Sequence, residues 1–153
     1  MIKDTYQQLQ KEHPLLPDYD KINNEFEIST IEDEEFLLRE ILRAMAERLE
    51  QIIQTLEPLI SPDPNSFTDL HECRSFTSGE KKQLIDCFRT LMKHYRLLLE
   101  TELALEPKKD VETIKAVFDM WHKERKQIAP FIKKIKESWE KQVEPKEDLE
   151  YLG

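Results

Sequence analysis

Residues 37–59 read LLREILRAMAERLEQIIQTLEPL, and this stretch decides the fold. Its apolar residues recur at alternating intervals of four and three, which is the heptad pattern of packed helices. This seam consists of Leu38, Leu42, Met45, Leu49, Ile52, Leu56 and Leu59. Leu37, Ile41 and Ile53 widen the apolar stripe, so the stretch is typical of a helix in a bundle core rather than of an isolated coiled coil.

Signals on both sides of this stretch predict a helix over about residues 30–57. Ser29 and Glu32 have the spacing of a capping box, in which each side chain accepts a hydrogen bond from the other residue's backbone amide. Pro58 and the proline-rich residues 61–66 predict the end of the helix, because proline lacks an amide donor and clashes with the preceding turn.

Two later stretches repeat the heptad pattern and predict helices over about residues 79–105 and 111–142. Thr77 and Glu80 form a second capping box, and Asp110 is expected to cap the last helix. The middle seam consists of Leu84, Phe88, Leu91, Tyr95 and Leu98. The last seam consists of Val111, Ile114, Phe118, Trp121, Arg125, Ile128, Ile132, Ile135 and Trp139.

The predicted fold is therefore all-α, an antiparallel bundle of three long helices. The connection between the second and third helices is short, which makes those two helices antiparallel neighbours. A further short helix is expected in the connector over residues 61–78, at about residues 69–74. Pro130 is expected to kink or split the last long helix.

The chain is expected to contain an arm, one domain and a tail. Residues 1–28 are expected to form an N-terminal arm, with a short helix over residues 4–10. Residues 18–28 fit a helix of one to two turns at their start and a strand at their end, and an extended segment is the third alternative. The bundle domain is expected over residues 29–143, and residues 144–153 are expected to form an acidic flexible tail.

The composition excludes several classes of protein. The 153 residues contain two glycines, fewer than hairpins and barrels need for their turns, and 36% of the residues are charged. The net charge of -9 argues against nucleic acid as a partner. No apolar run approaches the roughly 20 residues that cross a bilayer, so no membrane partner is expected. The opening residues lack a secretory pattern, which predicts a cytoplasmic location.

Charge is distributed unevenly along the chain. Residues 1–60 contain 14 acids and 6 bases, whereas residues 107–143 contain 6 acids and 10 bases. The last helix is therefore electrostatically suited to lie against the first long helix, within one molecule or between two.

Few residues have the spacing of metal ligands. His71 and Cys73 lie close together in the connector, but no second pair is present to complete a zinc site. His122 follows Asp119 by three residues, yet dinuclear helical bundles use two Glu-x-x-His motifs. A metal-binding bundle is thus a second alternative function, and no cofactor is predicted.

Arg89 and His94 have an Arg-x4-His spacing. This spacing resembles that of HEPN-type helical ribonucleases, in which such residues from two subunits bind and cleave RNA. The resemblance covers two residues and implies, as an alternative function, an RNA endonuclease or nucleic-acid-associated factor. Five residues of a regular helix turn through about 500°, so the two side chains converge only in a dimer or on a distorted helix.

Arg125 places a charge in an otherwise apolar seam. An unpaired buried charge is costly, so Arg125 is expected to meet a carboxylate or reach solvent near Pro130. Such a residue often specifies helix register or oligomeric state. No catalytic motif and no small-molecule ligand is identified. The sequence predicts a non-enzymatic interaction or assembly module that binds a partner protein or a second copy of itself as a homodimer.

Overall fold

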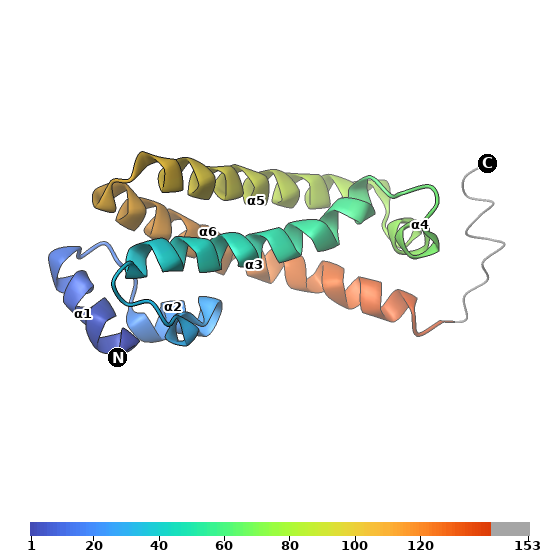
Figure 1. Ribbon diagram of the computed structural model, residues 1–153. Coiled ribbons are helices and arrows are strands. Elements are labelled where there is room, and N and C mark those ends of the chain that lie inside the picture. Colours follow the sequence, from blue (N-terminus) through green and yellow to red (C-terminus); the bar gives the residue numbers. More distant parts are fainter. Residues whose placement is uncertain (142–153) are drawn as a thin grey trace. The chain divides into compact units, whose positions relative to one another are not determined.

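The computed structural model describes residues 1–141 and contains helices but no strand in this range (Figure 1). The helices are α1 (Ile2–Glu12), α2 (Tyr19–Phe26), the 3-10 helix η1 (Ile28–Thr30), α3 (Leu37–Ile60), α4 (Phe67–Arg74), α5 (Ser78–Ala104) and α6 (Pro107–Ser138). The all-α prediction is confirmed. The predicted acidic tail, residues 144–153, lies outside the described residues. None of the described helices is both long enough and apolar enough to cross a bilayer.

The three long helices α3, α5 and α6 pack together, and α5 runs antiparallel to the other two. Arg39 near the start of α3 donates to the carbonyl oxygen of Glu102 near the end of α5, at 2.6 Å. Phe76, just before α5, and Phe131, near the end of α6, have ring centroids 6.0 Å apart. These contacts confirm the predicted antiparallel bundle.

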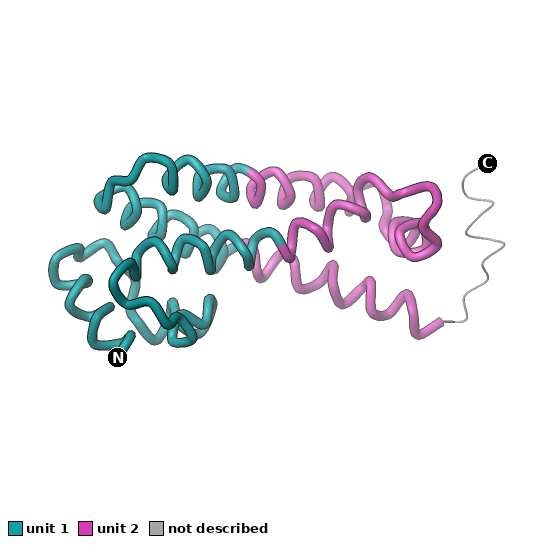
Figure 2. The backbone as a smooth tube through the Cα atoms, in the orientation of Figure 1, with its two compact units in different colours: residues 1–50, 93–123 teal, residues 51–92, 124–153 magenta. Residues whose placement is uncertain are grey.

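The chain forms two compact units, which are coloured separately in Figure 2. Unit 1 consists of residues 1–50 and 93–123, and unit 2 consists of residues 51–92 and the chain from residue 124 onward. Each long helix contributes one part to each unit. Residues 1–28, which were expected to form an arm, belong to unit 1.

Unit 1 holds α1 and α2 through buried aromatic side chains. Tyr6 of α1 is fully buried and donates its hydroxyl hydrogen to the carbonyl oxygen of Pro17, at 2.5 Å. Phe26 of α2 packs 6.3 Å from Trp121 of α6, whose indole Nε1 donates to Glu25 Oε2 at 3.2 Å. Of the helix, strand and extended alternatives for residues 18–28, the short helix is the one observed.

Helix α3 begins later than predicted, at Leu37 rather than at about residue 30. The Ser29 backbone amide donates to Asn23 Oδ1 at 2.8 Å, and residues 28–30 form the 3-10 turn η1. The predicted capping box over Ser29 and Glu32 therefore does not start the helix. The end of α3 was predicted too early, because Pro58 lies inside α3 and the helix continues to Ile60.

The start of α5 was predicted correctly and that of α6 was not. Glu80 N–H donates to Thr77 Oγ1 at 3.2 Å and Thr77 N–H donates to Glu80 Oε1 at 3.0 Å, so this capping box is formed. Helix α6 begins at Pro107, where a missing amide hydrogen has no cost, and Asp110 lies within its first turn. The helix runs through Pro130 to Ser138 and is not split.

The buried face of α6 differs from the predicted seam. Arg125 is exposed, whereas Glu124 is buried with 6% of its surface exposed, so the placement of Arg125 in the seam was wrong. The buried apolar residues of α6 are Val111, Ile114, Val117, Met120, Trp121, Ile128 and Phe131. After Ile114, the heptad pattern can continue at either the third or the fourth following residue. The structure buries the third.

Glu27 gives a test of the turn that separates α2 from α3. Its backbone is left-handed (φ 53°, ψ 42°), and its side chain is mostly exposed with Arg48 at 4.0 Å. Because glycine adopts this conformation without steric cost, Glu27→Gly should raise the free energy of unfolding by about 0.5–1 kcal/mol. Urea denaturation measures this change. The control Glu50→Gly, in regular α3, should lower stability by about 1 kcal/mol, and equal losses in both variants would contradict the prediction.

Candidate functional site

Leu105 occupies an unfavourable position between α5 and α6. Its φ of 56° is left-handed, which costs a non-glycine residue about 1 kcal/mol. Its side chain is 74% exposed, so packing within the described structure compensates little of that cost. Strained, exposed apolar residues are places to look for a binding function.

Leu105 lines a cavity of about 500 Å³ in unit 1. The cavity lies among α1, the segment before α3 and the start of α6, and its walls are mostly apolar. Its lining includes Leu9, Phe36, Leu38, Arg39, Leu105, Pro107 and Asp110. Phe36, like Leu105, is largely exposed, with 57% of its surface open to solvent. Two large apolar side chains therefore border a hollow wide enough to take a further apolar group.

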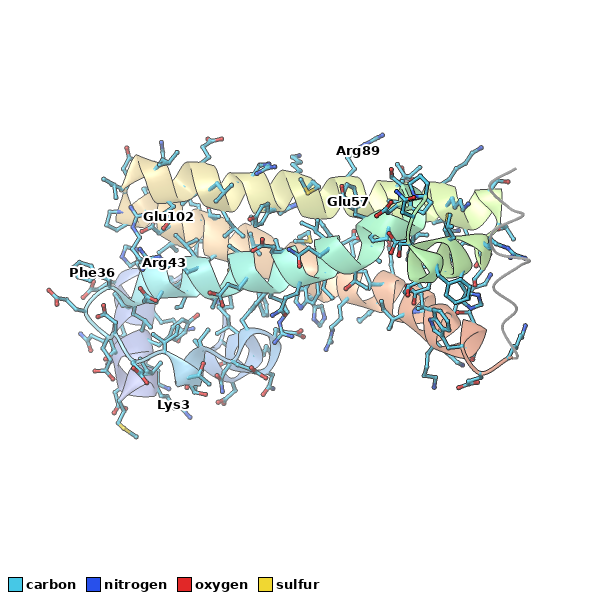
Figure 3. The ribbon with its side chains drawn as sticks, turned by 45° about the vertical axis from the view of Figure 1, so that its right-hand side comes forward. Lys3, Phe36, Arg43, Glu57, Arg89 and Glu102 are labelled. Carbon is cyan, nitrogen blue, oxygen red and sulfur yellow. The ribbon has the colours of Figure 1, made fainter. Side chains whose placement is uncertain are left out.

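A second cavity of about 390 Å³ shares Phe36, Arg39 and Leu105 with the first. Its other lining residues are charged: Asp33, Glu40, Arg43 and Glu102. Figure 3 shows Phe36 beside the start of α3 and Arg43 close to Glu102, whose Oε1 lies 3.3 Å from Arg43 Nε. We call the two cavities together the Leu105 groove.

Arg39 joins three helices beneath the groove. Its Nη1 donates to the Glu102 carbonyl oxygen at the end of α5, and its Nε lies 3.6 Å from Asp110 Oδ2 in the first turn of α6. Both side chains of this ion pair are mostly buried, with 16% exposure for Arg39 and 4% for Asp110. The pair therefore closes the base of the first cavity.

The other oxygen of Asp110 lacks a donor. Oδ1 is buried and accepts no hydrogen bond from any residue in the described part of the chain. Burial raises the pKa of Asp110, and the Arg39 guanidinium opposes that rise. A buried acceptor without a donor is costly, which makes Asp110 the polar group of the groove with an unfilled hydrogen-bonding position.

The charge of the groove lining is strongly acidic. Six acids and two arginines line the two cavities, which gives a balance of -4. The acids are Asp33, Glu34, Glu35, Glu40, Glu102 and Asp110. The groove thus combines apolar walls with a negative rim, and it contains no nucleophile placed beside a base among these lining residues.

Arg89 and His94 both lie on α5. Arg89 is exposed and Figure 3 shows it projecting from the helix, whereas His94 is half-buried. Helix α5 is regular over this range, so the two side chains leave faces about 140° apart. RNA cleavage by this pair stays a prediction that would need a second copy of the chain.

Two of the three candidate metal ligands, His71 and His122, have other polar neighbours. His71 Nε2 lies 3.0 Å from the Ser138 carbonyl oxygen, and its ring packs 4.1 Å from the Trp139 ring. Cys73 is a free, buried thiol, and His122 is exposed with its Nδ1 3.9 Å from Glu25 Oε1. Within residues 1–141, no group of three or more His, Cys, Asp or Glu side chains could hold a metal ion. The geometry gives the metal-binding alternative no support.

Unit 2 contains the charged residue of α6 that is buried instead of Arg125. Glu124 faces the buried Cys87 thiol, and burial together with this carboxylate raises the pKa of Cys87 to about 12. Glu124 Oε2 accepts no hydrogen bond from any described residue. The thiol therefore stays protonated at neutral pH and is a poor nucleophile. The prediction that Arg125 sets the register has no support from its exposed position.

Sequence reasoning missed the residues that build the groove. Leu105 follows the last turn of α5, a place where glycine or asparagine usually takes the left-handed conformation. The available signal for Leu105 was its position in the sequence, between the end of a helix and the Glu106-Pro107 pair. Asp110 was noticed only as a helix cap, and the exposure of Phe36 had no signal in the sequence.

The Arg39–Asp110 pair predicts a stability change that depends on pH. Arg39→Met leaves Asp110 without its cation and the Glu102 carbonyl without its donor, so it should cost about 3 kcal/mol at pH 7. Loss of Arg39 raises the already raised pKa of Asp110 further. The folded variant then favours protonated Asp110. Its stability is therefore greatest at pH values below the ordinary aspartate pKa of 3.8, and it falls as the pH rises through the pKa of the folded state.

Urea denaturation at about pH 4 and pH 7 measures this effect. The cost of Arg39→Met should be smaller at the lower pH, where Asp110 is neutral in the variant. The exposed Arg43 provides the control, because Arg43→Met should cost less than about 1 kcal/mol at both values. The same loss for both variants would show that the Arg39–Asp110 pair does not hold the base of the groove.

Comparison with protein families, with curated proteins and with solved structures found no match to this chain. The groove and its neighbouring side chains are therefore the basis for a functional assignment. Their geometry has apolar walls, an acidic rim and one buried acceptor with an unfilled position.

Proposed function

We propose that this protein is a non-enzymatic interaction module, and that the Leu105 groove receives apolar side chains of a partner protein. The observation that carries the proposal is Leu105 itself, whose backbone is left-handed and whose side chain is 74% exposed. A leucine that adds strain and buries little surface contributes little to the fold. Contact with a partner gives that side chain a role.

The surroundings of Leu105 support the same proposal. Phe36 is exposed beside it, and both side chains border two cavities of about 500 and 390 Å³. Large exposed apolar side chains next to a hollow are typical of binding hot spots, where a partner excludes water from a central anchor. A binding role also agrees with a lining that offers no catalytic pair.

Two substitutions remove the apolar contacts of the groove without removing buried side chains. Phe36→Ala deletes an exposed ring, and Leu105→Gly deletes an exposed side chain at a position where glycine relieves strain. The double variant should therefore fold with a melting temperature close to that of the wild type. Circular dichroism and thermal melting check this requirement first.

The binding test compares partners captured from the native cell by three forms of the chain. The wild type and the control Leu15→Ala, which changes an exposed leucine outside the groove lining, should retain the same protein. The Phe36→Ala/Leu105→Gly variant should lose it, with affinity for the purified partner reduced by at least about tenfold. Undiminished binding by the double variant would refute a role for the groove.

A further inference from the structure

We propose that the partner segment is a basic amphipathic helix, which places apolar side chains against Phe36 and Leu105 and a lysine or arginine toward Asp110. This inference rests on the proposed function and specifies the chemistry of the partner. It follows from three features: the sign of the charge of the Leu105 groove, the unfilled acceptor at its base, and the lack of a strand edge among the described residues.

The charge of the lining selects a cationic partner. Six acids against two arginines leave a balance of -4 around the two cavities. Arg39 does not offset the negative charge that a ligand would meet, because its guanidinium already contacts Asp110 and the Glu102 carbonyl oxygen. Arg43 is likewise paired, with Glu40 and Glu102. Glu34 is paired with the amino group of Met1 at 2.9 Å. With this cation counted, six carboxylates still face three cations in and beside the lining.

Asp110 supplies the position for one particular cation. Its side chain is 96% buried, lines the first cavity, and has an oxygen that accepts no hydrogen bond from the residues described. An ammonium or guanidinium carries several N–H donors and no acceptor, which suits a carboxylate oxygen with an empty position. A neutral apolar ligand would fill the cavity but would leave this oxygen without a donor.

The shape of the groove favours a helix over an extended segment. Addition of a partner strand requires the edge of a sheet, and the described residues contain no strand. The exposed Phe36 and Leu105 side chains stand between two cavities, so a helix with apolar residues three and four positions apart can pack around both. The polar face of such a helix would lie over the acidic rim.

The chain's own C-terminal residues do not have the required chemistry. Residues 144–153 contain four acids and one lysine, and like charges would repel them from the groove. A second copy of the chain is the other possible occupant. Sedimentation velocity of the wild type tests this alternative, and self-association that Phe36→Ala/Leu105→Gly abolishes would overturn the proposed partner.

Three synthetic peptides of about 14 residues, roughly four helical turns, provide the direct test with the full chain. They share one leucine face, and their polar faces consist of lysine, glutamine or glutamate. Fluorescence anisotropy should show that the lysine peptide binds about tenfold more tightly than the glutamine peptide, and that the glutamate peptide does not bind. Equal binding of the lysine and glutamine peptides would overturn the inference.

Matched charge variants separate the groove from the general acidity of the chain. Glu34→Gln/Glu35→Gln removes two carboxylates that line the first cavity, and should weaken lysine-peptide binding about fivefold. Glu47→Gln/Glu50→Gln removes two exposed carboxylates of α3 outside the lining, and should change affinity less than about twofold. Equal weakening by the two variants would show non-specific attraction and overturn the inference.

Asp110→Asn tests the cation at the base of the groove. It keeps the shape of the side chain and should weaken the lysine peptide more than the glutamine peptide, because only the former loses an ionic contact. The same loss with both peptides would overturn the role of Asp110.

The experiments distinguish failure of this inference from failure of the proposed function. Suppose that the lysine and glutamine peptides bind the wild type equally well and that Phe36→Ala/Leu105→Gly abolishes the binding of both. The proposal of apolar docking is then supported, and the proposal of a basic partner is refuted. If that variant binds the lysine peptide as the wild type does, the groove is not the binding surface and both proposals fail.

Discussion

Arg39 is the side chain on which the end of unit 1 depends. Helix α5 ends with carbonyl groups that no further turn can satisfy, and helix α6 begins with a carboxylate in its first turn. One guanidinium serves both, because its several N–H donors diverge in a fixed plane. The α5–α6 connection can therefore be short, and its shortness places Leu105 at the surface. The groove therefore lies beside the joint of these two helix ends, and the apolar side chains of Phe36 and Leu105 border it.

Periodicity predicts helix existence well because the apolar stripe must be buried whatever the surroundings are. The seams of α3 and α5 contain Met45, Leu49, Leu84 and Leu91, all of which are buried. Helix ends are harder to predict because they depend on competition for single hydrogen bonds. The amide of Ser29 donates to Asn23 Oδ1, so the capping box that its sequence allows is not used.

The phase of α6 shows a different limit. Two heptad registers share Ile114, Trp121 and Ile128. The register that the structure buries contains two charged residues, Asp110 and Glu124, whereas the predicted register contains one, Arg125. The predicted register has more apolar positions, so sequence pattern alone favours the register that the structure does not bury after Ile114. The groove lay beyond sequence reasoning for a related reason. A phenylalanine in an acidic loop gives no indication of whether it will be covered, and a strained backbone is visible only in three dimensions.

Leu105 has a consequence for how this chain changes over generations. Selection for folding alone would favour glycine or asparagine at a left-handed helix end. Persistence of a bulky aliphatic residue there, across diverged copies of the gene, would mean that each lineage retains it for contact with something else. The codon for residue 105 would thus record whether the proposed docking role has been kept or lost.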